Sequence, residues 1–429
     1  MRPTELRGAI VANRGLLLTL LAAFVLRLTL AIAVEHQVAG PPARLCLISG
    51  DAEGYWELAR KIVAGGDYSI YDPPRFVLRM PGFPLLLALS QALFGESPFA
   101  ARCLLAGVGT AACGFTYWLG RELADPMTGL LAAIYTACSP TLCLFSVMIL
   151  SETTFATTLL ASLIALARMA RHWDDSSTSG SRPGISLVAG ILIGAATLVR
   201  PTWLYAGSAL ALGVCVLGRP RETAFGWRPR VTSLAWLGIG LILTMAPWTI
   251  RNYAVTGHIV PTTLWVGPSL YDGLNSEATG DSNMRFFEDD QLLTRMSEYD
   301  MDREYRRRAW AFSAENPGRV MWLALEKQRR YWSLTPNAAQ FGHWTVQLAV
   351  CLTMVPLFCF ALRGIWLSRR NGVRLILTAG PVILFAAFHL LFVGSLRYRL
   401  PAEFPLAIAA AIGFKPILSR WISLRESPR

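Results

Sequence analysis

Long apolar runs, broken by short polar stretches, dominate the chain. Runs of about 17–22 apolar residues are long enough to cross a hydrocarbon core of about 30 Å as a helix. Segment 81–94 is also apolar but too short to span, so we expect a re-entrant or interfacial helix there. The pattern thus predicts an all-α polytopic membrane protein with about ten transmembrane helices. The expected spans are residues 15–34, 98–118, 128–146, 148–167, 185–200, 202–218, 233–250, 345–363, 375–394 and 404–418.

The predicted spans divide the chain into three parts. Residues 1–250 are expected to form a transmembrane core, which includes a first external loop at residues 35–80. Residues 251–344 are expected to form a long external loop with amphipathic helices. Residues 345–429 are expected to form the C-terminal transmembrane helices.

Within the long loop, Asn316-Pro317 is a typical helix start, with proline at the first helical position. The helix that follows would carry Val320, Leu323 and Trp332 on an apolar side and Lys327 and Arg330 on another. This pattern fits a helix lying on the membrane or across a cavity mouth. It fits equally a packed surface helix with a solvated basic face.

The net charge of +12 indicates how the chain is oriented in the membrane. With the N-terminus in the cytoplasm, the cytoplasmic pieces hold an excess of basic over acidic residues equal to this whole net charge. Both termini are therefore expected in the cytoplasm, as the positive-inside rule requires. Because this charge is a topology signal, it gives no support for nucleic-acid binding, which needs a clustered basic face.

Asp51, in the stretch ISGDAEGYW, is the first external residue that could carry chemistry. Residues 52–64 have the apolar spacing of an amphipathic helix, and Tyr55 lies one turn after Asp51. Asp51 stands at the N-terminal edge of this helix, where aspartate is a favoured cap. A cap and a catalytic carboxylate are compatible, because the helix dipole would keep the group ionised.

Glu152, in LSETTF, lies near the outer end of a predicted span among apolar and hydroxyl-bearing residues. A carboxylate in that position is costly unless it faces a wet cavity or a partner. Two interpretations remain open: a functional site, or a structural pair with a buried arginine, for which Arg27 is the obvious candidate.

Further polar residues fall at the external membrane boundary. Singly, each could be an interfacial anchor, since Arg, Tyr and Trp are common at that level. Together they bring arginines, which bind phosphate with paired hydrogen bonds, to the same side as two carboxylates, which could activate a hydroxyl. These residues are Arg79 in RMPGFP, Arg200 in a turn between two spans, Arg251 and Asn252 at the end of another span, and Arg397, Tyr398 and Arg399 in the last external return.

Six motifs, spread over most of the chain, resemble a known family in their order: GDAEGYWELARKI, RMPGFPLLLALSQALFG, LSETTF, GAATLVRP, PWTIRNYAVTG and RYRLP. The family is that of the dolichyl-phosphate-mannose protein mannosyltransferase-like proteins, glycosyltransferase family 39 and its relatives, which include the lipid A aminoarabinose transferases. The resemblance implies a GT-C-like bundle of transmembrane helices with external juxtamembrane helices. It also implies inverting transfer of a sugar from a polyprenyl-phosphate-linked donor to an acceptor glycan, lipid or protein. This transfer would occur on the external, periplasmic side of the inner (plasma) membrane.

The resemblance also implies roles for particular residues. Asp51 would be the catalytic base, and Glu152 would contact substrate or a metal. The remaining substrate-binding candidates are Tyr55, Arg79, Arg200, Arg251, Asn252, Arg397, Tyr398 and Arg399. Many relatives carry a second acid beside the first, whereas here Asp51 is followed by Ala52 and Glu53. No cofactor is therefore assigned, and a divalent metal stays open.

A different class of function is also compatible with a multi-pass chain. A polyprenyl-linked sugar flippase or transporter would need ionisable residues near the bilayer midplane and two repeated halves with broken helices. The sequence has no internal repeat, and its carboxylates and arginines gather on the external side. Glycosyl transfer is therefore the leading hypothesis.

Overall fold

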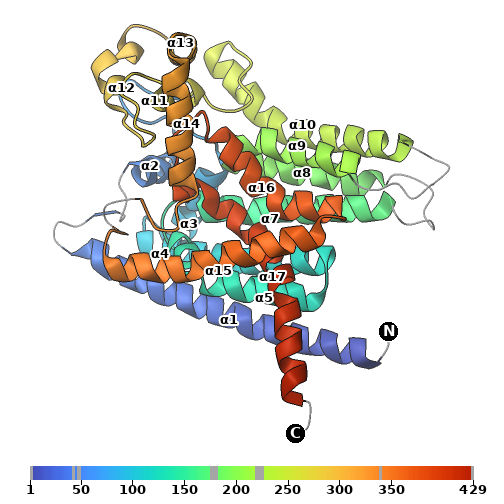
Figure 1. Ribbon diagram of the computed structural model, residues 1–429. Helices are drawn as coiled ribbons and strands as arrows, with labels where there is room; N and C mark the ends of the chain where they lie inside the picture. The colour runs from blue at the N-terminus through green and yellow to red at the C-terminus, as the bar shows by residue number, and fades with distance from the viewer. Residues whose placement is uncertain are drawn as a thin grey trace.

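The computed structural model describes residues 3–40, 44–45, 50–173, 182–217, 227–337 and 341–426. In these ranges the chain is a bundle of helices, with one isolated bridge between Ile70 and Arg75. The apolar helices lie side by side, and a smaller group of helices sits at one corner of the bundle (Figure 1). The all-α polytopic fold predicted from the apolar runs is confirmed.

Each predicted span corresponds to an apolar helix. Six helices in the described ranges are long and apolar enough to cross a membrane, and the other spans match shorter apolar helices. The helices are α1 (Pro3–Ala39), α4 (Pro98–Leu123), α5 (Pro126–Cys138), α7 (Glu152–Trp173), α8 (Pro183–Val199), α9 (Thr202–Leu217), α10 (Arg228–Thr256), α15 (Trp344–Ser368), α16 (Gly372–Phe388) and α17 (Leu396–Glu426).

Most helices begin or end a few residues from the predicted bounds, and two spans differ in a way that matters for the site. The span at 128–146 is divided at Ser139, because Pro140 cannot donate the next helical hydrogen bond, and a short α6 (Pro140–Phe145) follows α5. The last span begins at Leu396 and not at 404, so the RYRLP motif lies in the first turns of α17 and not in a loop. Pro401 is accommodated inside that helix.

The smaller group of helices comes from residues 51–94 and from residues 257–337. It consists of α2 (Asp51–Val63), α3 (Gly82–Phe94), α11 (Val266–Gly273), α12 (Arg285–Asp290), the 3-10 helix η1 (Leu292–Thr294), α13 (Glu298–Glu315) and α14 (Pro317–Tyr331). α3 would extend about 20 Å, too short to span, and it packs against α2 and α4. α14 runs across the ends of the spans (Figure 1).

The predicted start of α14 at Asn316-Pro317 is confirmed, but its faces differ from the prediction. Leu323, Lys327 and Tyr331, spaced four residues apart, form the buried side. The Lys327 ammonium donates to the carbonyls of Leu390 (3.2 Å) and Leu391 (2.7 Å). The prediction that Lys327 lies on a solvated polar side is wrong, because free backbone carbonyls beside α14 offer it acceptors.

Aromatic packing supports the ends of three spans. Phe155 of α7, Trp203 of α9 and Phe385 of α16 form a triangle with ring centroids 5.8–6.0 Å apart. Such contacts add to the dispersion that holds membrane helices together in the absence of a hydrophobic driving force. The triangle fixes the position of Glu152, one turn before Phe155 at the start of α7.

Arg27, in the middle of α1, is fully buried and crosslinks helices. It donates to Ser146 Oγ (3.1 Å) and to the carbonyl of Thr136 (3.0 Å). An arginine inside the membrane needs such acceptors. The alternative in which Arg27 pairs with Glu152 is therefore wrong: Arg27 binds backbone and hydroxyl oxygens of α5 and the segment after α6.

Replacing Arg27 by leucine should destabilise the bundle, because the carbonyl of Thr136 and the hydroxyl of Ser146 lose a charged donor. We expect a loss of about 2 kcal/mol, intermediate between values for polar contacts in membranes and in water. Thermal unfolding of the purified protein in detergent measures the effect. Arg14→Leu, at an exposed position of the same helix, is the control. Equal melting temperatures for both variants would contradict the crosslinking role.

Candidate functional site

An alternating chain of acids and arginines lies at one end of the bundle. Arg79 donates to Asp51 Oδ1 at 2.5 Å, and Arg397 Nη2 lies 2.9 Å from Asp51 Oδ2. Arg397 Nε donates to Glu152 Oε1, which also accepts from Arg200 Nη2 at 2.6 Å. We call Arg79, Asp51, Arg397, Glu152 and Arg200 the ion-pair network. All five were site candidates in the sequence.

The network joins segments that are distant in the sequence. Asp51 begins α2, Glu152 begins α7 and Arg397 belongs to the first turn of α17. Arg200 is held where Pro201 interrupts the chain between α8 and α9, and it also donates to Ser151 Oγ at 3.0 Å. The residues that break or begin helices therefore place the charges together.

Exposure changes along the network. The Asp51 side chain is 33% exposed, whereas that of Glu152 is 1% exposed. Glu152 Oε2 and Arg79 Nε are buried without a hydrogen-bond partner in the described part of the chain. The network thus opens at Asp51 and retains unused donor and acceptor capacity. Buried polar atoms of this kind usually have a partner, which is consistent with a ligand-binding site.

Asp51 does not cap its own helix. The N-cap position is Gly50, and Glu53 accepts from the Gly50 amide at 2.6 Å. Glu53 therefore takes the capping role that the sequence suggested for Asp51, and both Asp51 oxygens bind arginines. Tyr55 lies one turn later, with its ring 5.0 Å from the Arg79 guanidinium.

The loop that carries Arg79 is held from outside by α10 and α13. Arg251 donates to the carbonyls of Phe76 (2.7 Å) and Tyr68 (3.0 Å). Glu298, the first residue of α13, accepts from the amides of Phe76 (2.9 Å) and Val77 (3.1 Å). Arg251 therefore positions the loop instead of joining the network. Glu298 was missed in the sequence because no local pattern links it to a segment more than 200 residues away.

Asn252, the neighbour of Arg251, also forms hydrogen bonds with the backbone. It is buried and donates to the carbonyls of Val260 (2.9 Å) and Thr262 (3.3 Å). These bonds fix the chain that leaves α10. Asn252 is therefore not brought to the ion-pair network.

The turn that carries Arg397 is held by α14. Arg330 donates to the Gly394 carbonyl at 3.1 Å, and Lys327 binds the carbonyls that precede this turn. A Cβ at Gly394 would lie 2.3 Å from the Lys327 carbonyl oxygen. Glycine is therefore required where the turn and α14 touch.

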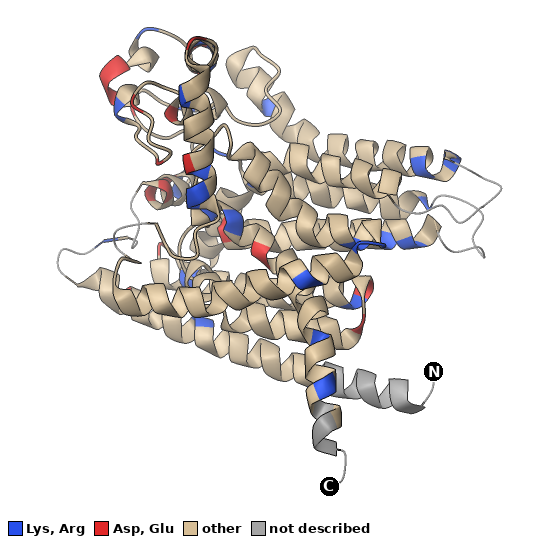
Figure 2. Cartoon of the chain, in the orientation of Figure 1, with Lys and Arg blue, Asp and Glu red and all other residues tan. Residues whose placement is uncertain are grey.

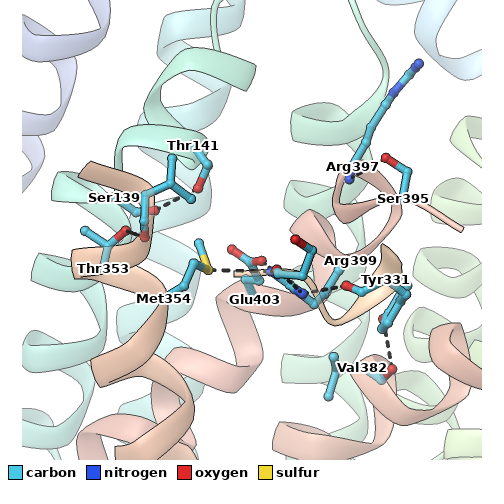
Figure 3. A network of polar contacts seen from close by, with 12 residues as sticks. Ser139, Thr141, Tyr331, Thr353, Met354, Val382, Ser395, Arg397, Arg399 and Glu403 are labelled. Atoms are coloured by element: carbon cyan, nitrogen blue, oxygen red, sulfur yellow. Dashed lines mark hydrogen bonds and ion pairs between the residues drawn. The ribbon is translucent and has the colours of Figure 1, made fainter. Parts of the chain in front are cut away.

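The three residues of the RYR triplet make different contacts. Arg399 is fully buried away from the network, bonded to Glu403 Oε1 at 2.9 Å and to the carbonyls of Tyr331 and Ser333. Figure 3 shows Arg397 and Arg399 pointing to different sides of α17. Tyr398 stacks on His389 with ring centroids 4.5 Å apart, and it interacts electrostatically with the charged residues of the network.

Electrostatics keep Asp51 ionised. Burial raises its pKa, but the charges of Arg79 and Arg397 and their hydrogen bonds outweigh burial and hold the pKa well below its usual range. Burial dominates at Glu298 and raises its pKa despite the two backbone amides. At Lys327 burial lowers the pKa to about 8. Asp51 is therefore a permanent anion in this arrangement.

The two carboxylates of the network do not fit a divalent metal as they are arranged. Arg397 lies between Asp51 and Glu152, and Glu53 caps α2. Within the described ranges no three His, Cys, Asp or Glu side chains gather in a ligand set. The donor set is that of an anion site with arginines in excess.

Comparisons with known proteins agree with the resemblance stated from the sequence. Residues 74–250 match the family model described as dolichyl-phosphate-mannose-protein mannosyltransferase. This range includes Arg79, Glu152 and Arg200, while Asp51 and Arg397 lie outside it. No curated protein matches the chain.

Solved structures of archaeal oligosaccharyltransferase share the fold. The oligosaccharyltransferase AglB from Archaeoglobus fulgidus, in complex with an inhibitory peptide and a dolichol-phosphate, is 17% identical, with a TM-score of 0.52 over 96% of this chain and 52% of that one. An Archaeoglobus fulgidus oligosaccharyltransferase in the apo form gives 16% identity and a TM-score of 0.53, with 96% and 52% coverage. ArnT from Cupriavidus metallidurans, bound to undecaprenyl phosphate, is 14% identical, with a TM-score of 0.43, and the match covers 92% of this chain and 77% of ArnT. This chain spans about half the length of the archaeal enzyme.

The pH dependence of stability should report the Asp51 ion pairs. The folded pKa is depressed below the ordinary value of 3.8, so their contribution is present above that value and is lost as the pH falls through the folded pKa. The melting-temperature gap between wild type and Asp51→Asn should stay constant from about pH 8 to about pH 5 and narrow only below about pH 4. A gap that closes near neutral pH would contradict the double pairing.

Gly394→Ala should displace the turn that carries Arg397, because its Cβ cannot fit against the Lys327 carbonyl. Overpacking of this kind costs about 1–3 kcal/mol. We expect a lower melting temperature, measured by thermal unfolding in detergent. Gly238→Ala, where a Cβ has nothing within 4 Å, is the control and should leave the melting temperature unchanged.

Proposed function

We propose that this GT-C-fold protein, a relative of the dolichyl-phosphate-mannose-protein mannosyltransferases, is a membrane glycosyltransferase that takes a sugar from a polyprenyl-phosphate-linked donor. The observation that carries the proposal is the ion-pair network, in which three arginines and two carboxylates meet at one end of a membrane bundle. Arginines suit the phosphate of such a donor, and a carboxylate suits the acceptor hydroxyl. The match to an oligosaccharyltransferase in complex with a dolichol-phosphate supports the same choice of donor.

Asp51 is the proposed general base. It takes the proton of an acceptor hydroxyl while that oxygen attacks the anomeric carbon from the face opposite the phosphate. The bond between the anomeric carbon and the phosphate oxygen breaks, and its electron pair leaves with the lipid phosphate, so the anomeric configuration inverts. Removing a general base typically costs about 10²–10⁴-fold in rate. Asp51 suits this role because it is the exposed carboxylate of the network.

The arginines are proposed to bind the leaving phosphate. Arg79 has an unused buried Nε beside its bond to Asp51, and Arg397 is shared between two acids. The donor phosphodiester carries one negative charge, as Asp51 does, but its two free oxygens can bind both arginines, and a second charge develops on the phosphate as it leaves. Donor binding would therefore draw them from Asp51 and raise the pKa of the carboxyl toward its ordinary range. A base that is weak in the free protein would then become effective when donor is present.

Glu152 and Arg200 are proposed to orient Arg397. Glu152 is buried and keeps its bonds to Arg200 and Arg397 without reaching solvent. In this scheme Glu152 acts neither as the base nor as a metal ligand. The remaining members of the site, Tyr55 and Tyr398, are proposed to position the arginines, since the buried Tyr55 ring packs against Arg79 and the Tyr398 ring is stacked on His389 beside Arg397.

The proposed orientation places the network on the external side of the inner (plasma) membrane and both termini in the cytoplasm. Lys and Arg positions, blue in Figure 2, are frequent at the helix ends on the side of the termini, as the positive-inside rule requires. The acceptor would reach the network past α11–α14, which surround its open end. A donor with a lipid tail would enter sideways from the bilayer.

Asp51→Asn should lower sugar transfer by about 10²–10⁴-fold without weakening donor binding. The assay uses purified protein in lipid nanodiscs, labelled polyprenyl-phosphate sugars and membrane extracts as acceptor source. Donor binding is measured separately by native mass spectrometry. Asp67→Asn, at an exposed acid of the same loop, is the matched control and should transfer sugar normally.

Three outcomes distinguish the roles. Transfer by Asp51→Asn at the wild-type rate would remove it as the base. Arg79→Gln should weaken donor binding, and unchanged binding would remove Arg79 from the phosphate site. If liposomes containing the protein move labelled donor across the bilayer without cleaving it, the protein is a flippase and the proposal fails.

A further inference from the structure

A second basic pocket lies at the other end of the bundle, outside the ion-pair network. It has a volume of about 390 Å³ and is formed where α4 ends, α5 and α16 begin, α15 ends and α17 passes. Its polar lining consists of Asp125, Thr128, Arg374, Lys415 and Ser419. Neither the proposed reaction nor the family resemblance assigns a role to this pocket.

The acid in this pocket is fully engaged by the protein. Asp125 caps α5, with Oδ1 accepting from the amides of Met127 (3.1 Å) and Thr128 (3.0 Å). Its Oδ2 accepts from Thr128 Oγ and from Lys415 Nζ, both at 2.8 Å. Both oxygens of the Asp125 carboxylate are thus occupied. Because this carboxylate carries one negative charge, it neutralises only one of the two cations that line the pocket, Arg374 and Lys415.

Arg374 supplies the remaining charge. Its Nε donates to the Leu123 carbonyl at 2.9 Å, which fixes the guanidinium at the pocket wall. In the described part of the chain its two terminal nitrogens have no acceptor, so they can form a paired contact with a phosphate. The starts of α5 and α16 lie at the same pocket and add their positive dipole ends.

The depth of the pocket matches a lipid headgroup. α16 begins at the pocket and ends just before the turn that carries Arg397, and its 17 residues correspond to about 26 Å at 1.5 Å per residue. This is close to the hydrocarbon thickness of about 30 Å. The pocket is therefore at the headgroup level of the leaflet opposite the ion-pair network.

The surroundings of the pocket are apolar and face outward. Leu367 lines the pocket and is itself exposed, and Trp366, Ile417 and Trp421 beside it are also exposed. Tryptophan is enriched at membrane interfaces, where one side is apolar and the other wet. Acyl chains can thus lie along α15 and α17 while a phosphate reaches Arg374 and Lys415. A soluble phosphate would gain nothing from this apolar surface.

We propose that this pocket binds the phosphate headgroup of an anionic phospholipid, held by Arg374 and Lys415. Basic pockets between membrane helices on the cytoplasmic side are a known form of lipid site. The proposal is independent of the glycosyltransferase function. A lipid bound in this pocket would hold α17 against the starts of α5 and α16.

The test compares lipid binding by wild type and Arg374→Gln. Delipidated full-length protein in detergent is titrated with phosphatidylglycerol, phosphatidylcholine and glycerol phosphate, and binding is followed by native mass spectrometry and by the rise in melting temperature. Wild type should prefer phosphatidylglycerol over phosphatidylcholine. Arg374→Gln should bind phosphatidylglycerol about fivefold more weakly, because the direct contact of its guanidinium with the phosphate in the pocket is lost.

Matched controls separate this pocket from general surface charge. Arg369→Gln and Arg370→Gln remove exposed arginines from the neighbouring turn, and each should retain wild-type binding. If Arg374→Gln does not fold, Lys415→Gln carries the same expectation of a fivefold loss. Equal weakening by all variants, or none by Arg374→Gln and Lys415→Gln, overturns the proposal. Displacement of the lipid by glycerol phosphate at equal concentration would identify a soluble phosphate site and overturn the lipid assignment.

Discussion

The placement of Arg397 between two carboxylates is the interaction on which the rest of the site depends. Glu152 is almost completely buried at the start of a membrane helix, and an uncompensated charge there would be prohibitive. Arg397 and Arg200 compensate it, and Arg397 then has a second nitrogen for Asp51. The start of α17, the start of α7 and the first loop are therefore fixed by one guanidinium. Packing of the helices at this end of the bundle therefore also brings the site residues together.

The outer helices maintain that arrangement. Glu298 and Arg251 hold the backbone of the loop that carries Arg79, and Lys327 and Arg330 hold the turn that precedes Arg397. Each contact joins a charged side chain to main-chain groups, which leaves the side chains of Arg79 and Arg397 available for the ion-pair network. The region 257–337 thus acts as a scaffold around the open end of the site.

The sequence predicted the helices well because apolar runs of membrane length have few alternatives. It also predicted which acids and arginines share one end, since alternation of spans places them there. It could not predict their partners. Arg397 and Arg399 are two residues apart, or about 200° around a helix, so only one of them can face Asp51, and the helical phase was unknown while RYRLP was taken for a loop. Lys327 and Glu298 bind backbone groups of remote segments, which leave no pattern in the chain.

The ion pairs also bear on how a strongly acidic carboxylate can act as a base. A base with a depressed pKa accepts a proton poorly, and Arg79 and Arg397 depress the pKa of Asp51 in the free protein. The same two arginines are those that a donor phosphate would attract. If the phosphate takes them, the strength of the base increases only when a donor is in place, and an acceptor hydroxyl bound alone is not deprotonated. Glu152 makes this exchange feasible, because it keeps Arg397 anchored while the outer half of its guanidinium changes partner. In this scheme Glu152 is needed so that Asp51 becomes a stronger base only when a donor is bound.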